Sequence, residues 1–246
     1  MSEAFRPRSN SAPRSFQGRL KFFGRMVLDL QILTIYRDLR TILPSLSGRI
    51  LDVGCGESPY RHLMDPTKTT YTGIDIVDAE KFDYINPDVI PFDGKRIPFP
   101  DETFDALICT EVLEHVLENQ TLTDEMLRVL KPGGRGIITI PWSARFHYIP
   151  HDYFRYTPSA LKHIFRGFRS ITIQPRGSDV SVIANKLIVM WFRNLIPSRK
   201  RFIPLIPLWA LGLPIPAMAT AAAHLSLWLG LGSEDDPLGY TIDVSK

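Results

Sequence analysis

The sequence predicts an open α/β sheet, and two short segments carry that prediction. The first, ILDVGCG from Ile50 to Gly56, is an apolar run that ends in two glycines, as in a strand buried on both faces before a tight turn. The second, YTGIDI from Tyr71 to Ile76, predicts another strand that ends near an acid. Gly54 and Gly56 lack a Cβ, so a ligand can approach the backbone, and the Asp75 carboxylate can accept both hydroxyls of a ribose. Together the segments predict a nucleoside-binding edge.

The glycine spacing argues against a dinucleotide at this edge. A dinucleotide fingerprint would place a third glycine at position 59, where this chain has proline. Glu57 also puts a negative charge where a helix N-terminus would otherwise favour a phosphate. These residues favour a ligand with a ribose and no phosphate, such as the sulfonium S-adenosylmethionine (SAM). The LDVGCG segment resembles the first motif of class I SAM-dependent methyltransferases.

Further segments extend this resemblance over residues 50–141. They are DGKRIPFPDETFD at 93–105, the strand-like ALICT at 106–110, EVLEHV at 111–116, and LKPGG at 130–134 before a fifth strand at 136–140. The resemblance implies a Rossmann-like, seven-stranded sheet whose last strand is antiparallel, with SAM as cofactor and methyl transfer as activity. It implies that Asp93 lies beside the adenine amino group. The implied cofactor-binding residues are Asp52, Gly54, Gly56, Asp75, Ile76, Asp93, Gly94, Thr110 and Glu111.

Changes in polarity and periodicity divide the rest of the chain into segments. Residues 1–18 form a polar, basic tail that we expect to be disordered. A helical pattern from Leu20 to Leu43 ends at Pro44, and this helix either covers the cofactor site or packs on the sheet edge. A sixth strand at 171–174 and a last strand at 239–244 flank an apolar insertion, residues 180–237, predicted to be helical. The methyltransferase domain would then comprise residues 19–179 and 238–246.

A second chemical cluster, HYIPHDYFRYTP, occupies residues 147–158. Thr157 and Pro158 predict the N-cap and first residue of a helix that stops near Gly167. A similar loop borders the acceptor pocket in a subset of the family. The resemblance therefore implies five substrate-binding residues, namely His147, Asp152, Tyr153, Arg155 and Tyr156. The alternative is a stabilising network in which Arg155 pairs with Asp152 and the tyrosine hydroxyls bond to backbone.

Methylation of a hydroxyl requires that its proton be removed, and a histidine with a pKa near neutrality suits that task. His151 and His115 are the candidate catalytic bases, although His115 also fits a structural role. An amine acceptor would need only positioning next to the methyl group. The expected acceptor is a small molecule, a glycan or a lipid-linked compound, with O-methylation favoured. The alternative from another class is a membrane-associated scaffold on a catalytically retired fold.

The insertion has no Asp or Glu from 180 to 233, and prolines interrupt its apolar run. One interpretation is a set of helices that lie in a membrane interface, anchored by basic residues and tryptophans. Those anchors would be Arg199, Lys200, Arg201, Trp191, Trp209 and Trp228. The others are a cap buried on the domain or in a homodimer, and a true membrane span, which the prolines disfavour.

The cysteines, the N-terminal residues and the net charge support the remaining predictions. The cysteines, Cys55 and Cys109, fall in predicted core elements and indicate reduced thiols in the cytoplasm, with the cytoplasmic membrane face as the expected site of any peripheral association. Neither has neighbours at metal-ligand spacing, and we predict no metal site. The N-terminus lacks the apolar run of a signal peptide. A net charge of +3 without a recognition motif makes nucleic acid an unlikely partner.

Overall fold

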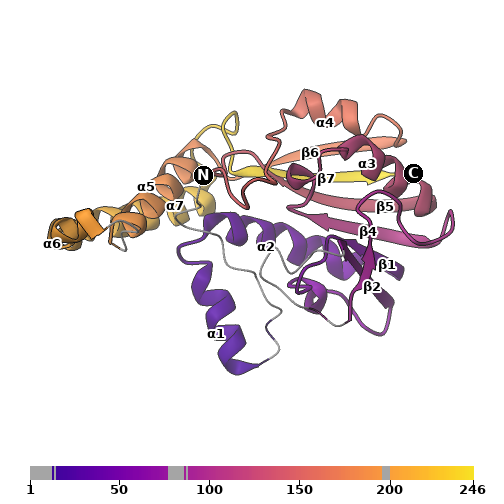
Figure 1. Ribbon diagram of the computed structural model, residues 1–246, viewed down its shortest axis with the longest axis horizontal. Helices are drawn as coiled ribbons and strands as arrows, with labels where there is room; N and C mark the ends of the chain where they lie inside the picture. Colours follow the sequence, from indigo (N-terminus) through magenta and orange to yellow (C-terminus); the bar gives the residue numbers. More distant parts are fainter. Residues whose placement is uncertain (1–12, 14, 77–85, 87, 196–199) are drawn as a thin grey trace.

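The computed structural model describes residue 13 and residues 15–76, 86, 88–195 and 200–246. A seven-stranded sheet with the order β3-β2-β1-β4-β5-β7-β6 forms its centre (Figure 1). β7 runs antiparallel to β5 and β6, whereas the other paired strands are parallel. The predicted fold class, including the antiparallel last strand, is therefore confirmed.

Six of the strands contain the predicted ranges, with β5 beginning earlier at Leu130, whereas no range was predicted for β3. The strands are β1 (Gly48–Val53), β2 (Thr69–Ile76), β3 (Ile90–Phe92), β4 (Phe104–Thr110), β5 (Leu130–Pro141), β6 (Ser170–Arg176) and β7 (Gly239–Ser245). In the register, Ile50 of β1 pairs with Tyr71 on one side and with Ala106 on the other. The carboxyl ends of β1, β2 and β4 therefore meet at one edge of the sheet, where open α/β folds bind their ligands.

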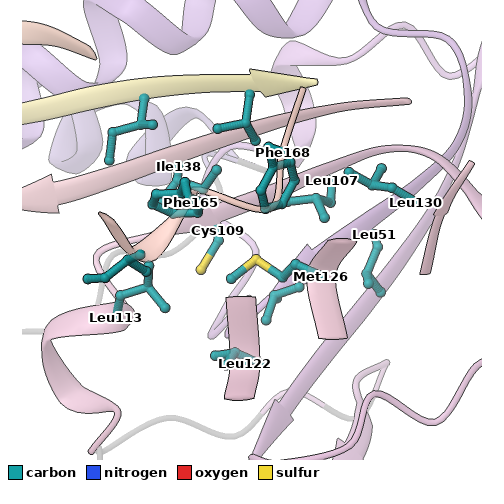
Figure 2. Packing of buried hydrophobic residues seen from close by; sticks show 14 of the residues in the cluster. Leu51, Leu107, Cys109, Leu113, Leu122, Met126, Leu130, Ile138, Phe165 and Phe168 are labelled. Atoms are coloured by element: carbon teal, nitrogen blue, oxygen red, sulfur yellow. The ribbon is translucent and has the colours of Figure 1, made fainter. Parts of the chain in front are cut away.

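Helices cover both faces of the sheet because the side chains of each strand alternate between them. Ile50 and Ile108 face α2 (Leu30–Ile42) in one buried cluster. Leu107 and Cys109 face the opposite side, where α3 (Asn119–Val129) and α4 (Pro158–Ile164) complete the larger cluster (Figure 2). Burial of this apolar area is the main stabilising contribution.

The N-terminal helical pattern forms two helices, which corrects the prediction of one helix from Leu20 to Leu43. They are α1 (Phe16–Arg25) and α2, and a short 3-10 helix, Leu43–Ser45, follows. Asp29 separates the two helices because its side chain accepts a hydrogen bond from Ile32 N and so caps a new helix. The start of α1 at Phe16 also makes residues 16–18 helical, where the sequence predicted a disordered tail. Residues 1–12 and 14 of that tail lie outside the described residues.

The insertion before β7 is helical, as predicted. It contains α5 (Asp179–Leu195), a 3-10 helix (Lys200–Leu205), α6 (Ile206–Leu211) and α7 (Pro214–Leu229). These helices extend away from one end of the sheet, with α6 farthest out (Figure 1). The base of the insertion packs on the domain through Leu30, Val182, Ala223 and Leu238.

Candidate active site

A cavity of about 850 Å³ lies at the carboxyl edge of the sheet. The glycine turn after β1 and the end of β4 form one wall, and the junction of α1 and α2 forms another. Residues 143–148 and one face of α5 close the remaining sides. Residues from α2 thus both pack on the sheet and line this cavity, so the two alternatives for the N-terminal helix coexist.

The glycine turn is shaped by steric constraints. Gly54 has a φ of 68°, and a Cβ added there would lie 2.5 Å from Val112 Cγ2. Gly56 N donates a hydrogen bond of 2.8 Å to Asp75 Oδ2, and Ile76 N donates one of the same length to Asp75 Oδ1. The predicted ribose acid is thus held beside the turn at the tip of β2. A side chain at position 54 would disrupt this arrangement.

Asp52 lies beneath the turn and supports it. Its Oδ2 accepts a hydrogen bond of 2.6 Å from the Tyr71 hydroxyl, which also donates to Ser58 Oγ. Burial raises the pKa of Asp52 to about 7; the Tyr71 hydrogen bond partly opposes this shift, and the charge of Asp75 adds to it. Asp52 is therefore placed to hold the turn rather than to face the cavity.

Asp93 and Gly94 follow β3, at the same edge but beyond the cavity wall. Asp93 is exposed, and its Oδ1 accepts hydrogen bonds of 2.8 Å from the backbone N–H groups of Arg96 and Lys95, which lower its pKa. A Cβ on Gly94 would lie 3.4 Å from Ile76 Cγ2, so the tips of β2 and β3 adjoin. The carboxyl ends of β2 and β3 thus form the side of the site where the adenine is predicted to bind. The other two predicted cofactor residues, Thr110 and Glu111, line the cavity.

The sequence did not reveal the partner of Glu111. Arg176, at the end of β6, is completely buried and donates hydrogen bonds to Glu111 Oε1 at 2.8 Å and to Ile140 O at 3.1 Å. The predicted strand ended at Gln174 and left this arginine out. An arginine at the end of a strand is a weak signal because most such residues are exposed.

The loop at 147–158 folds into the network that the alternative interpretation describes. Arg155 makes two hydrogen bonds to Asp152, of 2.6 and 2.8 Å. The Tyr156 hydroxyl donates to Leu113 O at 2.9 Å, and Tyr153 N donates to Glu114 O at 2.8 Å. Burial raises the pKa of Asp152, but the Arg155 bonds, the His147 N–H and nearby charges lower it by more. Of the five predicted substrate residues, His147 is the one that lines the cavity.

The two candidate bases occupy different places. The side chain of His151 is exposed, with Nδ1 3.2 Å from the Tyr153 hydroxyl, and His151 is not among the described residues that line the cavity. His115 belongs to a 3-10 turn, Leu113–His115, and it does line the cavity. Burial, opposed by the hydrogen bond to His151 O, lowers the pKa of His115 to about 4. Of the two predicted bases, His115 is the one that lines the cavity, and His147 lines it as well.

Glu114 is next to His115 but is not among the residues that line the cavity. It is completely buried, and burial, followed by the charge of Glu111, raises the pKa of its carboxyl well above the usual value. Neither carboxylate oxygen has a hydrogen-bond partner among the residues that the structure describes.

Comparisons with known proteins show which protein family this chain resembles. Residues 51–138 match the family model described as a methyltransferase domain. The human mitochondrial ubiquinone biosynthesis O-methyltransferase is 35% identical over 108 residues, 39% of this chain and 29% of that protein. A ubiquinone/menaquinone biosynthesis C-methyltransferase of Geobacter sulfurreducens is 30% identical over 149 residues, 53% of this chain and 57% of that protein. The chain thus spans less than two thirds of the length of either relative.

A solved structure of a SAM-dependent methyltransferase from Archaeoglobus fulgidus shares the fold, with a TM-score of 0.54 and 18% identity over 92% of this chain and 99% of that one. The sheet order and glycine turn define a class I methyltransferase fold. Together with the methyltransferase-domain match over residues 51–138, this fold supports a class I SAM-dependent methyltransferase.

The residues of the turn fit SAM, the cofactor of that class. The cradle at Gly54 would be filled by a Cβ, Asp75 is held at the tip of β2, and Glu57 disfavours a phosphate. Gly54, Gly56, Asp75 and Asp93 would hold the nucleoside.

Proposed function

We propose that this protein transfers the methyl group of SAM to a hydroxyl oxygen of an apolar, lipid-linked acceptor. One observation carries the proposal: a single cavity joins Gly54 and Gly56 of the cofactor turn to apolar side chains of α5. Those side chains include Ile188, Val189, Met190 and Phe192. An acceptor with an apolar chain could lie along α5 while its reacting end reaches the turn.

The cavity wall supplies the groups that such a transfer needs. SAM supplies a methyl group that its positive sulfur has already activated. The protein must hold the acceptor oxygen in line with the methyl–sulfur bond, and His115 and His147 lie in the wall beside that path. The neutral form of either imidazole accepts a hydrogen bond from the acceptor hydroxyl and orients it. The two relatives above are methyltransferases by name, and no observation favours the scaffold alternative.

Methyl-labelled SAM tests the acceptor class. Incubation with separate polar and lipid extracts of the host is expected to label the lipid fraction. Phe192→Asp puts a charge on the apolar wall and is expected to reduce labelling by about tenfold, with unchanged SAM affinity, whereas Phe192→Leu retains most labelling. Label confined to the polar fraction would contradict a lipid-linked acceptor, and label in neither fraction would contradict the proposed activity.

We propose further that α6 and α7 rest on a lipid surface, from which such an acceptor could enter. Leu211, Met218 and Trp228 are 81%, 73% and 77% exposed, and residues 180–233 contain no acid that a bilayer would disfavour. The predicted anchors Arg199, Lys200 and Arg201 lie outside the residues whose side chains the structure describes, and Trp191 is instead buried, donating a hydrogen bond to Trp209 O.

The length and hydropathy of the helices determine whether one of them could span a membrane. In the described ranges, no single helix is long and apolar enough for a membrane span, but residues 202–211 and 214–229 together pass that test as a pair bent by 57°.

Flotation with anionic phospholipid vesicles tests the lipid surface with a matched pair of variants. Leu208 on α6 and Leu117 on the catalytic domain are 66% and 65% exposed. We expect Leu208→Glu to reduce the floated fraction several-fold and Leu117→Glu to leave it unchanged. Equal flotation of the two variants would contradict the proposal. Concentration-dependent dimers without flotation would assign the surface to a second copy of the chain.

A further inference from the structure

Three side chains, two of which line the cavity, gather in an arrangement that the methyl-donor site does not explain. Glu114, His115 and His147 each offer one ligand atom, and these atoms all lie within 4.8 Å of one another. Glu114 Oε1 is 3.6 Å from His115 Nε2, and the two imidazole rings are 4.9 Å apart between centroids. Two of the residues are adjacent in sequence, and the third comes from the loop after β5.

The carboxylate of Glu114 lacks the partners that its acidic neighbours have. Arg176 pairs with Glu111 at 2.8 Å, and Arg155 pairs with Asp152 at 2.6 Å. Both oxygens of Glu114 are buried and, among the described residues, accept no hydrogen bond. An unpaired buried carboxylate costs several kcal/mol, so a carboxyl group in this state either keeps its proton or pairs with a cation. A cation that displaces the proton would give this carboxylate a partner.

The histidines are oriented as metal ligands usually are. His115 Nδ1 is 2.6 Å from His151 O, and His147 Nδ1 is 2.8 Å from Arg145 O and 3.0 Å from Asp152 Oδ2. An imidazole that donates its Nδ1 proton to a carbonyl or carboxylate presents the lone pair of Nε2 to a metal ion. His115 Nε2 is the atom that faces Glu114.

We propose that Glu114, His115 and His147 bind a divalent transition-metal ion. The 3.6 Å between the oxygen and nitrogen ligands suits two bonds of about 2.0–2.2 Å to one ion, and small side-chain movements would bring the third ligand in. Two imidazoles with one carboxylate favour Zn²⁺, Fe²⁺ or Mn²⁺ over Ca²⁺ or Mg²⁺. The proposal replaces the prediction of no metal, which rested on the spacing of the cysteines.

The ion would also define the acceptor more closely, and this step rests on the proposed function. With the ion bound, the ion rather than an imidazole nitrogen would contact the acceptor oxygen. Three protein ligands leave coordination positions open, and His115 and His147 line the cavity, so the open side faces the acceptor. A metal-bound hydroxyl loses its proton to water more readily. Its oxygen then forms the bond to the methyl carbon, the carbon–sulfur bond breaks, and the sulfur keeps the electron pair. The acceptor class is thus a hydroxyl that can ligate a metal.

Zn²⁺ titration of the chelator-treated full chain tests the site without SAM or acceptor. Calorimetry is expected to show one ion per chain, and Glu114→Gln and His147→Gln are each expected to weaken binding by about 10- to 100-fold or more. His151→Gln is the matched control, because it changes an exposed histidine of the same loop while keeping the backbone carbonyl that orients His115. The Co²⁺-substituted protein should show visible bands that Glu114→Gln lacks.

Thermal unfolding guards against a variant that fails to fold. Metal-free Glu114→Gln is expected to melt near the wild-type temperature because glutamine has nearly the shape of a protonated carboxyl group, and added Zn²⁺ should raise the wild-type midpoint but not that of the variant. No Zn²⁺ binding by the wild type, or equal binding by wild type and both ligand variants, would overturn the site. Metal binding without methyl transfer would instead count against the proposed function.

Discussion

Replacement of Arg176 by methionine is expected to lower the free energy of unfolding by about 3–5 kcal/mol. The Arg176 side chain is completely buried, and its guanidinium donates to Glu111 Oε1 and to Ile140 O. Methionine fills similar space but leaves the partly buried Glu111 carboxylate without its cation. Glu111 lies in the cavity wall, so the loss would also disturb the site.

Urea unfolding of a small variant series measures this effect. Arg169→Met is the control because Arg169 is exposed, and its change is expected to stay within about 0.5 kcal/mol. Glu111→Gln combined with Arg176→Met should recover part of the loss, since the unpaired charge is then gone. A loss below about 1 kcal/mol for Arg176→Met would show that Glu111 does not depend on this arginine.

Asp75→Ala is expected to weaken SAM binding by tenfold or more, about 1.4 kcal/mol for each factor of ten. The carboxylate lies at the tip of β2, where it can accept the ribose hydroxyls, and it holds Gly56 N at 2.8 Å. The variant removes both the ribose contact and this restraint on the glycine turn.

Calorimetric titration with SAM checks the prediction, with two further variants for comparison. Asp75→Asn keeps the shape and one acceptor oxygen, so an intermediate affinity is expected. Asp65→Ala removes an acid that caps a turn between β1 and β2, bonded to Thr67, and should leave SAM affinity unchanged. An unaltered affinity in folded Asp75→Ala would refute the assigned ribose contact.

The parts of the fold that were predictable are those whose conformation depends on residues close together in the sequence. The apolar run at β1 and the Thr157–Pro158 helix start each encode their conformation within a few residues. The break between α1 and α2 was missed because the apolar period continues across it, and the cap at Asp29 depends on one side chain. The glycine turn was predictable for a similar reason, since a Cβ at Gly54 would clash and both Gly54 and Gly56 have a positive φ, which glycine adopts most easily.

The acceptor side was less predictable because its parts come from distant segments. Its loop has many polar residues in a row, and sequence does not say which of them face the cavity: Asp152 and Arg155 pair with each other, whereas His147 faces inward.

Local patterning alone predicted the α/β class and the helical insertion, and it indicated a donor edge with Gly54, Gly56 and Asp75. These features arise from backbone conformation and periodicity over short stretches. Tertiary packing decided that Arg176 neutralises Glu111 across 65 positions, that His147 joins Glu114 and His115, and that α5 borders the cofactor turn. The physical reason is that burial and charge pairing depend on which side chains the folded sheet brings together, and the order of residues along a strand does not specify its distant neighbours.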